Sequence, residues 1–205
     1  MTDRKPIEIA GTLPLDSSRW DELDRFFGDR EPLADDLRVW LEQAAAAGTI
    51  RVDERRLSDI VNDILHQGTI AVSAYAVAPH FAEATDRVDA ESGLFLCETI
   101  GTIEQRRVET GLHCCTRGRD PDPPDLMPAY HEAVAAAGSR VLNQLDDYRD
   151  GLADRDDDPD GLVRMVTDVL PYLVGARRGR PSQPPRSWIV RHDDGRITID
   201  SERTT

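Results

Sequence analysis

Apolar residues recur at intervals of three and four along most of this chain, the spacing that places side chains on one face of an α-helix. The clearest stripe, in the third such segment, comprises Leu57, Ile60, Val61, Ile64 and Leu65. Glycines and prolines separate the segments and supply ends and starts for helices. The pattern predicts a mainly α-helical fold of about seven helices, covering approximately 16–27, 31–48, 53–68, 70–84, 91–108, 125–150 and 162–173.

The stretch 61–82, VNDILHQGTIAVSAYAVAPHFA, joins the third and fourth predicted helices. Gly68 can adopt the left-handed conformation that ends a helix, and Thr69 can cap the next one. We therefore expect a tight αα-hairpin at this corner. Pro79 removes the hydrogen bond to the carbonyl of Tyr75, so the fourth helix should bend.

The last part of the chain changes in character from helical to β. Two short apolar runs flank Asp194 and Gly195, a residue pair typical of two-residue hairpin turns. We predict a β-hairpin over 186–201 that packs on a helical domain spanning 1–180. That domain should begin with a short extended segment.

Successive helices joined by short turns favour an α-solenoid, in which helix pairs stack on one another. The related pentapeptides at 77–81 and 169–173, VAPHF and VLPYL, lie 92 positions apart, about two repeats of HEAT or armadillo length. We therefore predict a HEAT/armadillo-like α-solenoid with a small C-terminal β-hairpin.

The LHQGTIAVSAYAVAPHF stretch resembles a corner found in small bacterial HEAT-like repeat proteins, and this resemblance spans residues 57–103. The matching positions are His66, Gln67, Gly68, Ser73, Ala74, Tyr75, Pro79 and His80. The resemblance implies a binding scaffold and carries over no catalytic residues. Some proteins of this kind look like companions of secreted toxins.

The chain is strongly acidic, with a net charge of −14 and a pI near 4.7. This charge disfavours direct nucleic-acid binding, because contacts to phosphates need local cations, and it favours a protein partner with a basic surface. Eight aspartates lie between residues 146 and 160, in either a solvated loop or a docking surface. We hypothesise an immunity or antitoxin-like inhibitor of a partner such as a nuclease toxin, with contacts from Asp146, Asp147, Asp156, Asp157 and Asp158.

A metal-dependent enzyme is the alternative from another functional class. Asp63 and His66 share one predicted helix face, as do His80 and Glu83, and the corner could bring the two pairs together. The simpler interpretation is that His66 caps carbonyls at its helix end and that His80 is hydrogen-bonded beside the proline. A regulatory scaffold with a different partner is the third possibility.

No apolar run is long enough to span a membrane, and the first residues contain no signal-peptide core. We expect a cytoplasmic protein that needs no cofactor and makes no membrane contact. Its three cysteines do not form an even-numbered framework and should be reduced thiols.

Overall fold

Six α-helices make up most of the computed structural model, which describes residues 7–23, 25–27, 32–110, 122–152, 161–177, 189–191 and 197–199. The helices are α1 (Leu33–Ala47), α2 (Glu54–Ile64), α3 (Ser73–Ala84), α4 (Ala90–Thr110), α5 (Met127–Leu152) and α6 (Leu162–Arg177). The prediction of a mainly helical fold is confirmed. The predicted helix count is wrong, because the described residues hold six α-helices rather than about seven.

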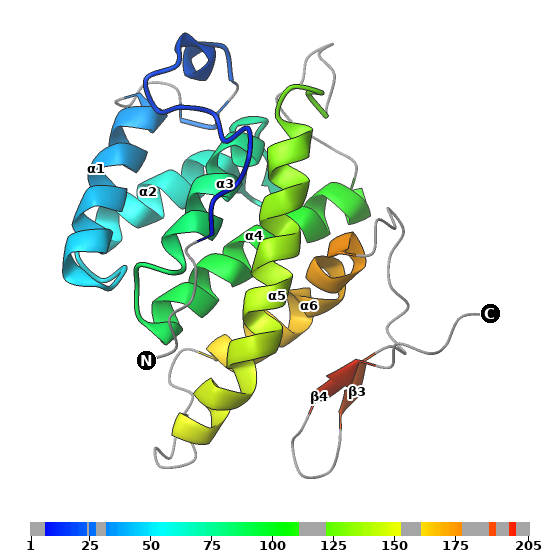
Figure 1. Ribbon diagram of the computed structural model, residues 1–205. Helices are drawn as coiled ribbons and strands as arrows, with labels where there is room; N and C mark the ends of the chain where they lie inside the picture. The colour runs from blue at the N-terminus through cyan, green and yellow to red at the C-terminus, as the bar shows by residue number, and fades with distance from the viewer. Residues whose placement is uncertain are drawn as a thin grey trace.

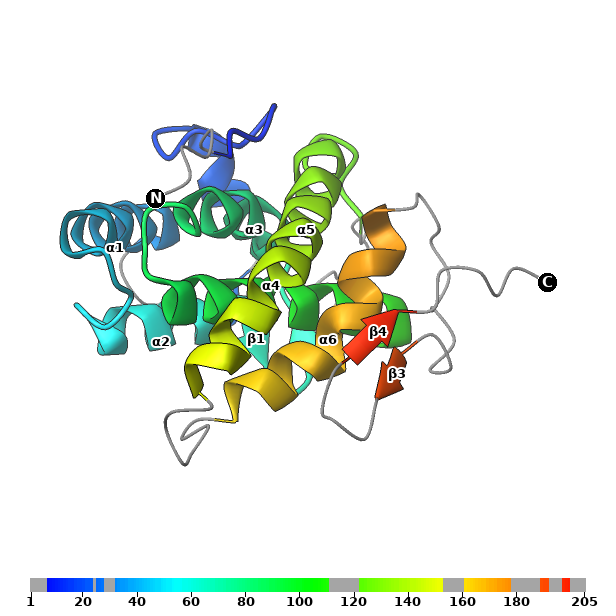
Figure 2. The same cartoon turned by 60° about the horizontal axis from the view of Figure 1, so that its bottom comes forward.

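The helices form two layers. Figure 1 shows α1 and α2 on one side of α3 and α4, with α5 and α6 on the other side. In Figure 2 the helices α1, α3 and α5 lie in one layer and α2, α4 and α6 in the other. The helices α4, α5 and α6 each pack against the other two, and α3 packs against both α4 and α5. The core therefore lies between the layers.

Close contacts in the core depend on large aromatic side chains and on glycines. Trp40 of α1 meets Phe81 of α3 edge to face, with their ring centroids 5.6 Å apart. A Cβ atom at Gly101 would lie 2.5 Å from Cγ2 of Val169, and one at Gly138 would lie 2.9 Å from the carbonyl oxygen of Leu173. The two glycines thus let α4 and α5 approach α6 more closely than any larger residue would.

The predicted boundaries between α1 and α2 are confirmed. Gly48 ends α1 in the left-handed conformation, with a φ of 70°, and its N–H donates to the carbonyl of Ala44. Asp53 caps α2, where its carboxylate accepts a 3.0 Å hydrogen bond from the backbone N–H of Arg56.

The predicted α-helix over 16–27 is wrong. The structure has only a five-residue 3-10 helix there, η1 (Ser18–Glu22), capped by the Ser17 side chain. Beyond it, the N–H of Phe26 donates to the carbonyl of Asp63 over 3.1 Å, and the N–H of Phe27 donates to the Asp63 carboxylate over 3.2 Å. These amides bond to α2 instead of to their own segment, which is why an α-helix does not continue.

The predicted αα-hairpin at 61–82 is also wrong in its detail. The helix α2 ends at Ile64, and β1 (Leu65–His66) then pairs with β2 (Thr69–Ile70) in an antiparallel hairpin. Gln67 and Gly68 both have positive φ, 48° and 80°, as a two-residue hairpin turn requires. Thr69 does not cap α3, because its hydroxyl donates to the carbonyl of His66 over 2.7 Å.

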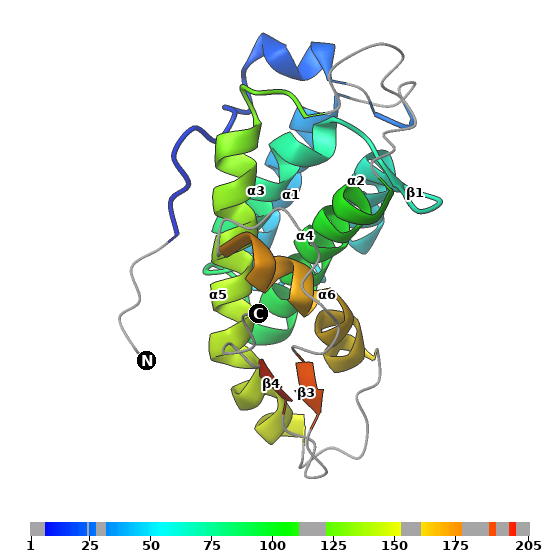
Figure 3. The same ribbon diagram turned by 90° about the vertical axis from the view of Figure 1, so that its right-hand side faces the viewer.

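Pro79 and Pro171 both lie inside helices, in α3 and α6 respectively. Figures 2 and 3 show that α3 and α6 belong to different layers. The similar pentapeptides around the two prolines therefore do not occupy equivalent places in successive helix pairs, and they give no support to an internal repeat.

The C-terminal hairpin is confirmed as a secondary-structure element. The strands β3 (Ile189–Arg191) and β4 (Ile197–Ile199) are antiparallel, and Ile189 is paired with Ile199. The predicted turn residues Asp194 and Gly195 lie outside the described residues. Packing of the 186–201 hairpin on the 1–180 helical domain stays a prediction.

Candidate protein-binding groove

An open groove of about 460 Å³ lies between α2, α4 and α6, the three helices of one layer. Its lining comes from all three helices and from the turn before α2. The lining residues are Ile50, Arg51, Glu54, Leu57, Ser58, Val61, Asn62, Glu91, Ser92, Phe95, Leu162 and Met165. We refer to this feature as the α2–α4–α6 groove.

The floor of the groove is apolar. Leu57 and Leu162 are buried, whereas Val61, Phe95 and Met165 are only half-buried. Partly exposed apolar side chains from three helices thus share one concave surface. A concave apolar surface of this kind is typical of sites that receive a ligand or a partner side chain.

The polar groups at the rim mostly bond to one another. The Arg51 guanidinium pairs with the Glu91 carboxylate, and the Asn62 amide donates to the Ser58 hydroxyl over 3.4 Å. The Ser92 hydroxyl accepts a 3.1 Å hydrogen bond from the N–H of Ile50. The contacts of Arg51 and Ile50 tie the turn before α2 to the first turn of α4 and so fix one end of the groove.

Glu54 differs from the other rim residues. Its side chain is exposed in the first turn of α2, and its carboxylate makes no hydrogen bond or ion pair with any other residue that the structure describes. An exposed carboxylate beside an apolar floor can pair with a cationic group of a binding partner.

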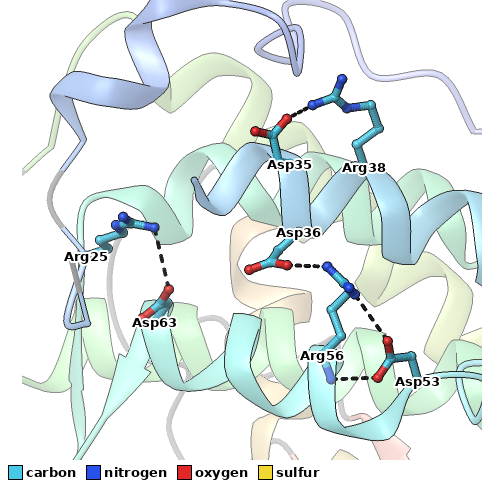
Figure 4. A network of polar contacts seen from close by, with 7 residues as sticks. All are labelled: Arg25, Asp35, Asp36, Arg38, Asp53, Arg56 and Asp63. Carbon is cyan, nitrogen blue, oxygen red and sulfur yellow. Dashed lines mark hydrogen bonds and ion pairs between the residues drawn. The ribbon is translucent and has the colours of Figure 1, made fainter. Parts of the chain in front are cut away.

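The opposite side of α2 is joined to α1 by an ion pair, as Figure 4 shows. Arg56 pairs with Asp36 of α1 and also with Asp53, whose carboxylate lies 3.2 Å from Nε of Arg56. The hydrogen bond from the backbone N–H of Arg56 keeps the pKa of Asp53 below its usual value. A second pair, Arg38 with Asp35, lies along α1. The helix α2 is therefore fixed on one side while its other side lines the groove.

The four residues considered for metal binding have other partners. Asp63 accepts from the N–H of Phe27 and lies 4.0 Å from Nη1 of Arg25, a pair that Figure 4 includes. His66 meets the ring of Phe27 edge-on, with a centroid distance of 5.0 Å. It lies in β1 and packs on an aromatic ring, so the interpretation of His66 as a cap at the end of a helix is wrong.

His80 and Glu83 hold the N-terminal segment against α3. Nε2 of His80 lies 2.9 Å from the carbonyl oxygen of Leu13, and burial lowers the pKa of His80. Glu83 accepts hydrogen bonds from the N–H of Ile9, over 3.0 Å, and from the hydroxyl of Thr12, over 3.1 Å. Among the described residues, no group of three or more His, Cys, Asp or Glu side chains is placed to hold a metal ion.

The predicted acidic contact surface is only partly covered by the structure. Asp146 and Asp147 lie in the last two turns of α5, and the orientation of their side chains is not among the described features. Asp156, Asp157 and Asp158 lie outside the described residues. Their role in binding a partner stays a prediction.

Sequence patterns did not reveal a polar network formed by Tyr75, Glu104, Arg107, Asp122 and Tyr130, which is largely buried except at Asp122, whose side chain is 43% exposed. Glu104 is 4% exposed, and both of its oxygens lie 2.8 Å from guanidinium nitrogens of Arg107. The Tyr130 hydroxyl also donates to Glu104 over 2.8 Å, and the Tyr75 hydroxyl donates to Asp122 over 2.9 Å. Burial raises the pKa of both tyrosines. This network joins α3, α4 and α5.

The groove residues were also missed, although the sequence contained a signal. The apolar stripe of α2 is wide, with Ile60 and Ile64 fully buried in its centre and Leu57 and Val61 on its flank. A stripe of that width can contact more than one neighbouring helix. The positions of Phe95 and Met165 beside it depend on how α4 and α6 pack, which periodicity does not show.

Comparison with models of known protein families, with curated proteins and with solved structures found no match. The resemblance to HEAT-like repeat proteins therefore stays a prediction. Within the described residues, no helix combines the length and the apolar character needed to cross a membrane.

Proposed function

We propose that this chain is a protein-binding helical-repeat protein of the cytoplasm, and that it acts as an immunity or antitoxin-like inhibitor of a basic partner such as a nuclease toxin. The observation that carries this proposal is the α2–α4–α6 groove, which leaves Phe95 and Met165 partly exposed on a concave apolar floor. Apolar surface collected in this way is a common feature of protein interaction sites.

The order of the helices supports a scaffold of stacked pairs. In this interpretation α1 with α2, α3 with α4, and α5 with α6 are three successive units of an α-solenoid. The middle pair contacts both of the others, and each layer takes one helix from every pair. Stacked helix pairs present extended surfaces on which partners bind, and the groove would lie on one of these surfaces.

The charge of the chain supports a basic partner. A net charge of −14 attracts cationic proteins over a distance and raises the rate at which they associate. In the proposal, Asp146, Asp147, Asp156, Asp157 and Asp158 guide the partner by electrostatic attraction, and the groove holds one of its apolar side chains. The two features have separable roles, because attraction between exposed charges is screened by salt whereas apolar burial is not.

Affinity capture tests this proposal. The full-length tagged chain is captured at low and at high salt from the cells in which it naturally occurs. The same capture is carried out separately with Met165→Glu and with a double variant of Asp156→Asn and Asp157→Asn. Leu142→Glu is the matched control, because Leu142 is an exposed apolar residue of α5 that does not line the groove.

We expect one dominant basic partner that Met165→Glu loses and Leu142→Glu keeps. High salt and the double variant should weaken capture, because both remove electrostatic attraction. The proposal fails if no partner is captured at either salt concentration, or if Met165→Glu and Leu142→Glu retain the same partner equally.

The activity of the captured partner separates an inhibitor from a regulatory scaffold. The partner is assayed for cleavage of DNA and RNA with increasing amounts of the chain. An inhibitor should abolish cleavage at a one-to-one ratio, and Met165→Glu should not. A partner without nuclease activity would contradict the immunity role and would favour the scaffold.

No described contact favours a metal-dependent enzyme, because Asp63, His80 and Glu83 all bind N-terminal residues.

A further inference from the structure

We infer that the α2–α4–α6 groove receives an amphipathic helical segment of the partner, with its apolar face on Leu57, Phe95 and Met165 and a basic side chain facing Glu54. This inference rests on the proposed function and names the chemistry of the partner. It follows from three properties of the groove: its polar groups, its walls and its charge.

The polar groups of the groove favour a protein segment over a small polar ligand. Sites for small ligands usually contain a few polar groups that converge on the ligand and orient it. Here Arg51 is paired with Glu91, Asn62 is bonded to Ser58, and the Ser92 hydroxyl is engaged by the turn before α2. Apart from Glu54, the remaining lining residues are apolar and include Phe95 and Met165, side chains that suit an apolar partner face.

The walls of the groove favour a helix over an extended segment. All of the lining residues that the structure describes lie in α2, α4 and α6 or in the turn before α2, and none of them belongs to a strand edge. An extended segment on this floor would have backbone N–H and C=O groups without partners, which is costly away from water. A helix satisfies these groups internally, and a helix with one apolar face is a recurrent ligand of hydrophobic grooves.

The spacing of residues along α2 sets the size of the contact. The lining residues of α2 run from Glu54 to Asn62, a stretch of nine residues whose first and last Cα atoms are about 12 Å apart along the helix axis. A partner helix of about three turns covers that length. Apolar side chains at positions i, i+3, i+4 and i+7 of the partner would form the matching face.

The charge at the rim sets the orientation of the partner. Glu54 lies at the start of α2 and makes no contact through its carboxylate with another described residue, whereas Glu91 is already paired with Arg51. An arginine or lysine near one end of the partner helix would therefore pair with Glu54. The net charge of −14 favours the same sign of partner.

Selection from a phage library of randomised peptides of about 16 residues tests the inference. The library is selected on the full-length wild-type chain, after removal of phage that bind Met165→Glu, and the enriched peptides are synthesised. We expect an i, i+3, i+4, i+7 apolar pattern with a basic residue near one end. The Kd of these peptides for the Met165→Glu and Phe95→Ser variants should be at least tenfold higher than for the wild-type chain. Their Kd for Leu142→Glu, a substitution outside the groove, should equal that for the wild-type chain.

A charge swap at Glu54 gives the sharper test. Selection on Glu54→Arg should return peptides with an acidic residue in the place of the basic one. Each peptide should bind its own version of the chain about tenfold more tightly than the other. The inference is overturned if no peptide is enriched over Met165→Glu, if the enriched peptides lack a helical apolar pattern, or if the swap leaves their charge unchanged.

These outcomes are distinct from failure of the proposed function. If natural capture depends on Met165 but the selected peptides are not amphipathic helices, the inference fails and the function stands. If such peptides bind the groove but the native cells yield no partner, the function fails while the chemistry of the groove is as inferred.

Discussion

The helix α4 meets its neighbours differently at its two ends. Near its C-terminal end, Glu104 and Arg107 join the buried polar network with Tyr130 of α5. Near its N-terminal end, Glu91 and Phe95 line the groove with α2 and α6. The polar network buries Glu104 and gives each of its charged groups a partner, whereas the groove leaves apolar groups open.

This difference separates residues that maintain the fold from residues available for binding. A buried carboxylate is tolerated only when it is hydrogen-bonded and paired, so the network fixes how α3, α4 and α5 pack together. A half-exposed phenylalanine gains further burial only from a partner. Substitutions in the network should therefore change the stability of the chain, and substitutions in the groove should change mainly its binding.

The largest expected effect is that of Glu104→Ala. This change leaves the Arg107 guanidinium and the Tyr130 hydroxyl without their shared acceptor in a buried site. We expect the free energy of unfolding to fall by about 3 kcal/mol, measured by urea denaturation. Glu54→Ala at the groove rim is the matched control and should cost less than about 1 kcal/mol. Equal losses for the two variants would contradict the distinction between network and groove.

The two glycines of α4 sharpen the comparison, because Gly93 follows the groove residue Ser92 whereas Gly101 packs against Val169 of α6. Gly101→Ala should lower the free energy of unfolding by about 1–3 kcal/mol, since its Cβ would lie 2.5 Å from Cγ2 of Val169. At Gly93 the nearest atom to an added Cβ is 3.4 Å away, so Gly93→Ala should be neutral or stabilising by up to about 1 kcal/mol. Thermal and urea unfolding check both variants, and we expect Gly101→Ala to lose stability and Gly93→Ala to lose none.

The tyrosines of the network predict a loss of stability at alkaline pH. Burial raises the pKa of Tyr75 and Tyr130, so above about pH 10 the unfolded chain releases protons that the folded chain keeps. Their contribution to stability is therefore present below pH 10 and falls as the pH rises, by up to about 1.4 kcal/mol per pH unit for each tyrosine.

Tyr130→Phe tests this alkaline loss through the slope of unfolding free energy against pH between about 9.5 and 11. The slope should become less negative by the contribution of one tyrosine, because phenylalanine has no hydroxyl proton to release. Cys97, with its pKa raised by burial to about 12, adds a loss that this variant leaves in place. Phe95→Ser is the control, and it should leave the slope unchanged because the lining residues that the structure describes include no tyrosine.

Sequence patterns predicted the parts of the fold that depend on local interactions. The C-terminal end of α1 and the start of α2 lie within one residue of the predicted bounds 48 and 53, where Gly48 and Asp53 act within one turn of their own position. Local signals of this kind are independent of how distant segments pack.

Predictions failed where a distant partner decided the local structure. The segment 16–27 has helical spacing, but Asp63 of α2 binds the amides of Phe26 and Phe27. The network and the groove likewise need residues from three helices each, and no single segment contains either one. The corner at Gln67 is different, because its positive φ is unusual for a residue other than glycine and local propensity did not indicate it.

A small effect on stability is expected for Phe95→Ser, which tests whether the groove floor belongs to the core. Phe95 is half-buried, and serine has a similar helix propensity, so the loss in unfolding free energy should be about 1 kcal/mol. Ile100→Ala, at a fully buried position of the same helix, should cost about 2–5 kcal/mol. If both variants lose the same amount in urea denaturation, Phe95 is a core residue and the groove is no binding surface. If Phe95→Ser stays near its expected value while partner capture is lost, the exposed part of the ring serves binding.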